Sequence, residues 1–199
     1  MSFGLTVALR SSSVALCLRA FVVSPLYIVT ERFDPDRGDD WKKYISWSGL
    51  TQLQEVVSLD SILCPKVIDE ILPEDWDHIV NEDFMLDYFT DLDYLLQRAG
   101  ELDGRNLLCV YKNPDGDLNP SDSRFDLEGY DLIDVMGGVS TLSNCGGFPL
   151  AFDNRELNRV GLLPALDRAH AVRAALRSNY PDEPHANCDV WAIFRARQS

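Results

Sequence analysis

The sequence predicts an α+β fold in which helices pack on one face of a largely antiparallel sheet. A run of helical segments over residues 41–100 is followed by strands that are mostly joined by hairpins. The chain has 199 residues, of which 46% are hydrophobic and 25% charged, and this composition is typical of one globular domain. We therefore expect residues 26–199 to form a single α+β domain.

Local patterns predict each element in turn. Residues 26–33 (LYIVTERF) are rich in β-branched and aromatic residues and precede a turn cluster, so they predict a first strand. Helical spacing is clearest over residues 83–99, where Gly100 is a suitable stop. Further helices are expected over residues 48–60 with Ser48 as N-cap, 65–72, 73–80 and 163–180. Further strands are expected over residues 105–112, 125–134, 139–145 and 188–197.

Residues 1–25 differ from the rest of the chain. They contain Arg10 and Arg19 but no acidic residue, and they are apolar and serine-rich, as targeting peptides are. Arg19 interrupts the apolar run and no small-residue cleavage site follows it, so we expect a leader, an extension or a poorly ordered segment. No run reaches the roughly 20 apolar residues that a membrane span requires, which predicts a soluble protein with no membrane partner. Five cysteines without paired close spacing favour free thiols and a cytoplasmic location.

Charge and motifs exclude several function classes. The net charge is −14, whereas a nucleic-acid binder should present a basic surface. The sequence contains no P-loop, dinucleotide-binding glycine pattern, nucleophile elbow or H-E-x-x-H zinc motif. We therefore expect no cofactor and no nucleic-acid partner.

The hairpin predicted through Gly137-Gly138 fixes a set of facing residues. Counting outward from a two-residue turn places Asp131 opposite Asn144 at the edge of the core. A carboxylate there needs donors, which the Asn144 amide and the backbone N–H groups around Gly146 and Gly147 could supply. The pattern predicts a structural clamp made of Asp131, Asn144, Gly146 and Gly147.

Cys145 also allows two chemical alternatives. It could be a nucleophile with His185 as base, Asp189 orienting that base, and the two following glycines forming an oxyanion pocket. Reactive thiols need a positive environment, however, and this domain is strongly acidic. Cys145, His185 and Cys188 could instead bind a metal ion, although structural zinc sites normally have four ligands. We expect neither catalysis nor a metal.

Asp83, Asp87 and Asp91 are spaced at i, i+4 and i+8 on the predicted helix over residues 83–99. Like charges at this spacing reduce helix stability slightly. They predict either a solvated face or a docking surface for a basic protein, where acidic groups would speed encounter and set specificity.

Three segments resemble an uncharacterised family of small bacterial proteins: GYDLIDVMGGVSTLSNCGGF, ELNRVGLL and PHANCDVWAIF. The family is similar in its order of G-Y-D, S-N-C-G, L-N-x-x-G-L and H-A before a final aromatic strand. The resemblance covers residues 125–194 and implies an immunity-like or accessory binding role, which some members are thought to have; it assigns no catalytic residue.

The first hypothesis is a non-enzymatic, acidic module that neutralises or escorts a basic protein. The alternatives are a cysteine-dependent hydrolase or transferase that uses Cys145 and His185, and an orphan structural domain. The oligomeric state has no signal in the sequence.

Overall fold

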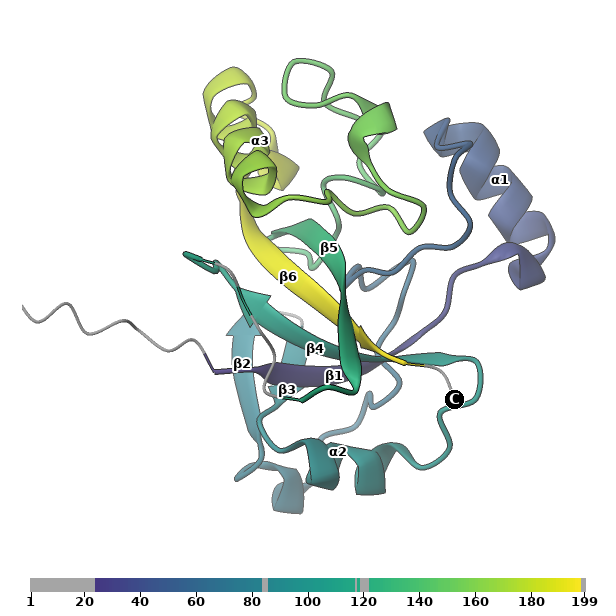
Figure 1. The fold of residues 1–199 in the computed structure, drawn as a ribbon, viewed down its shortest axis with the longest axis vertical. Coiled ribbons are helices and arrows are strands. Elements are labelled where there is room, and N and C mark those ends of the chain that lie inside the picture. The colour runs from purple at the N-terminus through teal and green to yellow at the C-terminus, as the bar shows by residue number, and fades with distance from the viewer. Residues whose placement is uncertain (1–23, 84–85, 117, 119–121, 198–199) are drawn as a thin grey trace, which may run out of the picture.

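Six strands form one antiparallel sheet in the order β2-β3-β1-β4-β6-β5 (Figure 1). The computed structural model describes residues 24–83, 86–116, 118 and 122–197. The strands are β1 Leu26–Glu31, β2 Ile79–Asp83, β3 Leu86–Phe89, β4 Arg105–Lys112, β5 Phe125–Asp134 and β6 Cys188–Ala196. The helices are α1 Asp39–Ser48, α2 Leu92–Ala99 and α3 Leu166–Asn179, with short 3-10 turns that include η2 Pro73–Asp75. The α+β prediction is confirmed.

The four strands β1, β4, β6 and β5 form the centre and one edge of the sheet, and all four were predicted. Their side chains alternate between two buried clusters, as successive residues of a strand must. Cys109 and Phe194 lie in one cluster, while Leu108 and Trp191 lie in the other. A strand buried on both faces carries a nearly continuous apolar run, which is why RNLLCVYK and CDVWAIFRA were recognisable.

The helices α2 and α3 cover one face of the sheet. Leu95 of α2 and Val172 of α3 are buried in the same cluster as Cys109. Figure 1 shows α3 near the top of the sheet and α2 below it. The opposite face is covered by irregular segments, from which Val57 and Leu162 are buried against it. No helix in the described part of the chain is long and apolar enough to cross a bilayer.

The predicted helices over residues 48–72 are wrong. Ser48 ends α1, and Gly49 follows it in the left-handed conformation with φ 68°. The chain then runs without a helix to η2 and pairs with β1 at one isolated bridge, between Thr30 and Lys66. Val56 and Val57 are adjacent yet belong to the two different clusters, so this segment is extended. Its apolar spacing reflects two-sided packing rather than a helical face.

The predicted helix over residues 83–99 is half wrong. Its first part is strand β3, and α2 begins only after Asp91, whose side chain accepts a hydrogen bond from the Tyr94 N–H. Tyr88 stacks on Trp191 with ring centroids 5.0 Å apart, while Phe89 is buried on the other face. Sheet pairing and packing on both faces therefore override the helical pattern. Likewise, residues 73–80 form η2 and the start of β2 rather than a helix.

The predicted hairpin after β5 is also wrong in its turn and register. The return segment makes one isolated bridge, from Ser140 to Ile133, where a two-residue turn would have paired Ser140 with Val135. The Asp134 carboxylate accepts hydrogen bonds from the Met136 and Gly137 N–H groups, which widens the turn. The residues predicted as a strand over 139–145 therefore form a loop against the end of β5.

Candidate functional site

Three buried aspartates gather where β5 ends. Asp60, Asp131 and Asp134 are each at most 2% exposed, and we call them the buried aspartate cluster. Ser140 joins two of them, because its N–H donates to Asp60 at 2.7 Å and its hydroxyl donates to Asp131 at 2.7 Å. Within the described residues, no lysine or arginine forms an ion pair with any of the three, and the imidazole of His185 lies against Asp134. Hydrogen bonds therefore compensate for the burial of these carboxylates.

Asp131 lies where the clamp was predicted but has other partners. It accepts hydrogen bonds from the Ser58 hydroxyl at 2.5 Å, the Ser140 hydroxyl and the Leu132 N–H. Burial raises the pKa of Asp131 to about 6, against the opposing effect of these hydrogen bonds. The predicted pair with Asn144 is wrong, since the shifted turn moves Asn144 away.

Asn144 instead bonds Asp60, which the sequence did not single out. Its amide donates to both Asp60 oxygens at 3.2 and 3.0 Å. Asp60 also accepts from the N–H groups of Ile62 and Leu63 at 2.9 and 2.7 Å. The real clamp thus joins the loop around Asp60 to the loop after β5. Aspartate commonly forms turns because its carboxylate can accept from N–H groups two or three residues ahead. The aspartate in SLDSIL (residues 58–63) was therefore the available signal in the sequence.

Gly146 and Gly147 lie just beyond this clamp. Both have positive φ angles, 73° and 90°, so they shape the bend that the sequence suggested. They line a hollow of about 380 Å³ together with Phe148 and Phe152. Among the described residues, the backbone N–H group that donates to Asp131 is that of Leu132. Neither Gly146 nor Gly147 donates to Asp131 there, so their predicted part in the clamp is wrong.

His185 is paired with an aspartate, although not with the predicted one. Its Nδ1 donates to Asp134 Oδ2 at 2.5 Å. Asp189 instead accepts a hydrogen bond from the Asn113 amide at 3.0 Å and lies 3.4 Å from the Lys112 ammonium group. The predicted role of Asp189 is therefore wrong, because the start of β6 directs it toward the end of β4.

Cys145 lies in an environment that disfavours its thiolate. Its thiol donates to the Ser140 carbonyl at 3.4 Å. Burial raises the pKa of Cys145 to about 12, with further contributions from the charges of Asp134, Asp60 and Asp131. Activated cysteines have the opposite environment, with positive charge nearby. The site therefore holds a neutral thiol at physiological pH.

The structure does not assemble the alternative metal ligands. Within the described ranges, no group of three or more His, Cys, Asp or Glu side chains is arranged to hold a metal ion. Cys188 is fully buried within β6, and His185 is committed to Asp134. The alternative set of Cys145, His185 and Cys188 is therefore wrong.

Asp83, Asp87 and Asp91 do not share a helical face, so that prediction is wrong. Asp83 ends β2, Asp87 lies within β3 and Asp91 caps α2. Asp87 lies 3.4 Å from the Lys66 ammonium group, which offsets part of its charge.

A larger concentration of acid surrounds these residues. Residues 69–103 contain twelve Asp and Glu residues against one arginine, a net charge of −11 out of −14 for the chain. They form η2, β2, β3 and α2, grouped in the lower part of the molecule in Figure 1. We call its exposed carboxylates the acidic surface: Asp69, Glu70, Glu74, Asp77, Asp91, Asp93, Glu101 and Asp103. Except for Asp91, which lies 4.0 Å from His78, they form no ion pair with another described residue.

Trp76 projects from the acidic surface. It is 69% exposed and lies directly between Glu74, the buried Asp75 and Asp77 in the chain. Asp75 anchors this turn, because it accepts hydrogen bonds from the Tyr94 hydroxyl and from Arg98 of α2 at 2.8 Å. The hydrogen bond from Arg98 is the main cause that holds the pKa of Asp75 well below its usual range. Trp76 is thus an exposed aromatic on a fixed support.

Comparison with known proteins does not indicate a function, so the proposal below is argued from the geometry of these sites. The resemblance to small bacterial proteins stays a prediction. No family model matches the chain, and no curated protein or solved structure shows significant similarity to it.

Proposed function

We propose that this protein is a non-enzymatic binding module for a basic protein, which it neutralises or escorts by means of the acidic surface. The observation that carries the proposal is the exposed Trp76 among carboxylates without cationic partners. Monomeric surfaces expose many single apolar side chains, but a tryptophan fixed within a strongly charged region has the composition of an interface centre.

The charge supports fast and selective association. A field that is concentrated on one region steers a basic partner to it and disfavours acidic competitors. Lysine and arginine side chains of such a partner could also stack over the indole ring of Trp76, in an interaction worth about 0.5 to 2 kcal/mol.

The support beneath Trp76 suits this role. The ring of His78 stacks on Tyr94 with centroids 3.8 Å apart, and Tyr94 in turn donates to Asp75. Because the turn is fixed to α2 before any partner arrives, little conformational entropy remains to be lost on binding.

The test compares charge variants in affinity capture from the native host at low salt. The double variant Glu74→Lys with Asp77→Lys reverses the charges beside Trp76, and Trp76→Ala removes the ring. The matched control is Asp182→Lys with Glu183→Lys, two adjacent exposed acids in the loop before β6. We expect a basic protein that salt releases, retained by the wild type and the control. Trp76→Ala should weaken its binding by about 30-fold.

Two outcomes would contradict the proposal. One is that no basic protein is retained by the wild type at low salt. The other is that both double variants lower retention equally, which would show that net charge matters but the acidic surface does not.

A cysteine-dependent hydrolase or transferase is the second candidate, favoured by the pairing of His185 with Asp134. This pairing leaves the other ring nitrogen available as a base, as in known catalytic dyads. The raised pKa of Cys145 opposes it. The rate at which iodoacetamide alkylates Cys145 at neutral pH, followed by peptide mass spectrometry, distinguishes the enzyme from the binding module. A rate above that of free cysteine, lost in His185→Ala, would favour the enzyme.

A further inference from the structure

A cavity of about 420 Å³ at one end of the sheet gathers four arginines: Arg32, Arg105, Arg195 and Arg197. It lies where β1 and β6 end and β4 begins. The rest of its lining is Leu102, Asp103, Gly104, Leu107 and Ala196. We propose that this cavity binds a small anion that carries at least two oxyanion groups. Asp103 of the acidic surface also lines the cavity, but the proposal does not depend on a basic protein binding to that surface.

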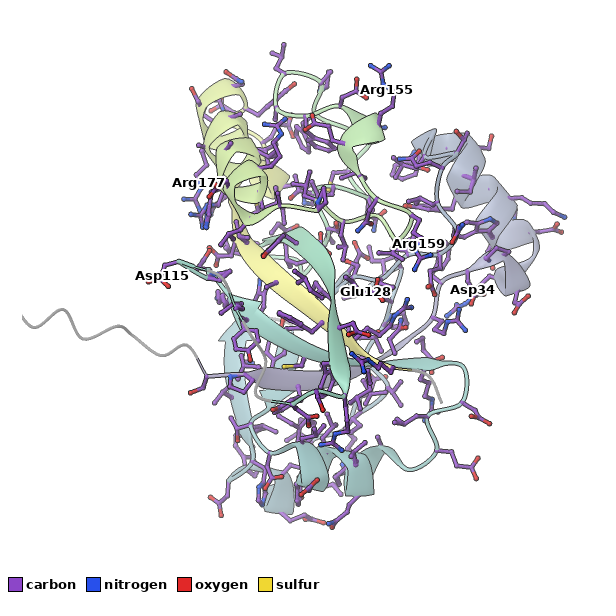
Figure 2. All side chains as sticks on the ribbon, in the orientation of Figure 1. Asp34, Asp115, Glu128, Arg155, Arg159 and Arg177 are labelled. Carbon is purple, nitrogen blue, oxygen red and sulfur yellow. The ribbon has the colours of Figure 1, made fainter. Side chains whose placement is uncertain are left out.

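Carboxylates hold three of these guanidinium groups in place, those of Arg32, Arg195 and Arg197. Glu55 accepts from Arg32 Nη2 at 2.9 Å and from Arg195 Nη1 at 2.7 Å, and Glu128 accepts from Arg195 Nε at 2.8 Å. Burial raises the pKa of Glu55, but the hydrogen bonds from Arg195 and Arg32 prevail and lower it. Asp34 also pairs with Arg32, and Figure 2 labels it to the right of Glu128 at about the same height.

Arg197 and Arg105 are oriented in different ways. Arg197 donates from Nε and Nη2 to the Asp126 carboxylate, each at 2.8 Å. Arg105 donates from Nη1 to the carbonyls of Ala99 and Glu101 at 3.4 and 3.0 Å.

Each of the four groups keeps one terminal nitrogen without a hydrogen-bond partner among the described residues. These nitrogens are Arg32 Nη1, Arg105 Nη2, Arg195 Nη2 and Arg197 Nη1. A guanidinium group is planar and always charged, so fixing one edge also fixes the direction of the remaining donors. Four such donors around one cavity match phosphate or carboxylate oxygens better than they match a single anionic group.

The negative charge of the whole chain means that anion binding would indicate a specific site. A protein of net charge −14 repels anions in general, so anion binding requires a local arrangement of donors. The paired carboxylates reduce the local positive charge, and we therefore expect hydrogen-bond geometry to determine which anions bind.

The experiment is calorimetric titration of the full chain with inorganic pyrophosphate and, separately, with succinate. Arg105→Gln and Arg197→Gln should each weaken binding about tenfold. Arg155→Gln is the matched control, because Arg155 also forms a surface pair with an aspartate, Asp153, but lies outside the cavity. Tighter binding of pyrophosphate would identify a phosphate ligand, and tighter binding of succinate a carboxylate ligand.

A second measurement guards against misfolded variants. Binding of pyrophosphate or succinate to the wild type should shift the NMR signals of the Nε–H groups of Arg32 and Arg195, and leave that of Arg155 unchanged. Absence of saturable binding to the wild type, or equal weakening by Arg155→Gln, would overturn the proposal.

Discussion

Asp75 and Arg98 form a paired-donor contact at a fully buried carboxylate: Arg98 Nε lies 2.8 Å from Asp75 Oδ1, and Nη2 lies 3.0 Å from Oδ2. The contact joins the turn that carries Trp76 to helix α2. It therefore connects the stability of this part of the fold with the shape of the acidic surface.

Replacing Arg98 should show how much this contact contributes. Arg98→Met keeps much of the side-chain volume but leaves the Asp75 carboxylate buried without its cation, and we expect the free energy of unfolding to fall by about 3 kcal/mol. Urea denaturation measures the change. Arg124→Met is the control, because Arg124 pairs with Asp122 at an exposed position, where such pairs are worth about 1 kcal/mol or less. Equal losses in the two variants would contradict the assignment.

Asp131 should make the stability of the protein depend on pH in the opposite sense to an ordinary salt-bridged acid. Its folded-state pKa of about 6 lies above the ordinary value of 3.8 for an aspartate, so the folded state holds its proton more tightly than the unfolded state. The stabilisation is complete below the unfolded pKa and is lost as pH rises through the folded pKa. Between about pH 4 and pH 7 this amounts to roughly 2 kcal/mol.

Asp131→Asn removes this titration while keeping the shape of the side chain. The Ser58 hydroxyl can rotate to accept from the new amide NH2, while the amide oxygen still accepts from the Ser140 hydroxyl and the Leu132 N–H. Urea denaturation across this pH range should therefore show a flatter profile for the variant than for the wild type. Identical slopes would show that Asp131 does not titrate there.

The sequence was sufficient for strands buried on both faces and insufficient for segments that cover the sheet. The apolar runs of β4 and β6 have no helical interpretation of comparable strength, and both were predicted within one residue. Tyr88 and Phe89 were assigned to a helix because adjacent apolar residues fit both periods. The packing of Tyr88 on Trp191 favours the strand over the helix, and this contact between distant residues cannot be predicted from local sequence.

The candidate sites divide in the same way. The acid content of residues 69–103 can be counted in the sequence, but the burial of Asp75 and the exposure of Trp76 depend on how the turn meets α2. The arginine cavity has no local signal, because Arg32, Arg105 and Arg195 meet only where three strands end side by side.

Asp60 should contribute more to the free energy of unfolding than Asn144, which donates to it across the clamp. Asp60→Asn places amide hydrogens against N–H groups that need an acceptor, and we expect a loss of about 3 kcal/mol. Asn144→Ala removes one donor from a carboxylate that keeps the N–H groups of Ser140 and Leu63, so the loss should be about 1 kcal/mol. Urea denaturation gives both values, and the reverse order would contradict this account of the clamp.

Gly129, the glycine of the G-Y-D segment, should tolerate no side chain. Its φ is 148°, and an added Cβ would lie 2.8 Å from both Leu162 Cβ and the Leu163 carbonyl oxygen. Neither contact can relax easily, because Leu162 is buried and Leu163 exchanges backbone hydrogen bonds with Tyr130. We expect Gly129→Ala to lower the free energy of unfolding by about 3 kcal/mol.

Gly116→Ala is the matched control for Gly129→Ala, since a Cβ at that position would have no neighbour within 4 Å. Urea denaturation should show that this variant changes stability by about 0.5 kcal/mol or less. If Gly129→Ala were equally mild, the bulge between Leu127 and Gly129 would have to move without cost. The close approach of β5 to the loop at Leu162 would then not be what requires glycine at this position.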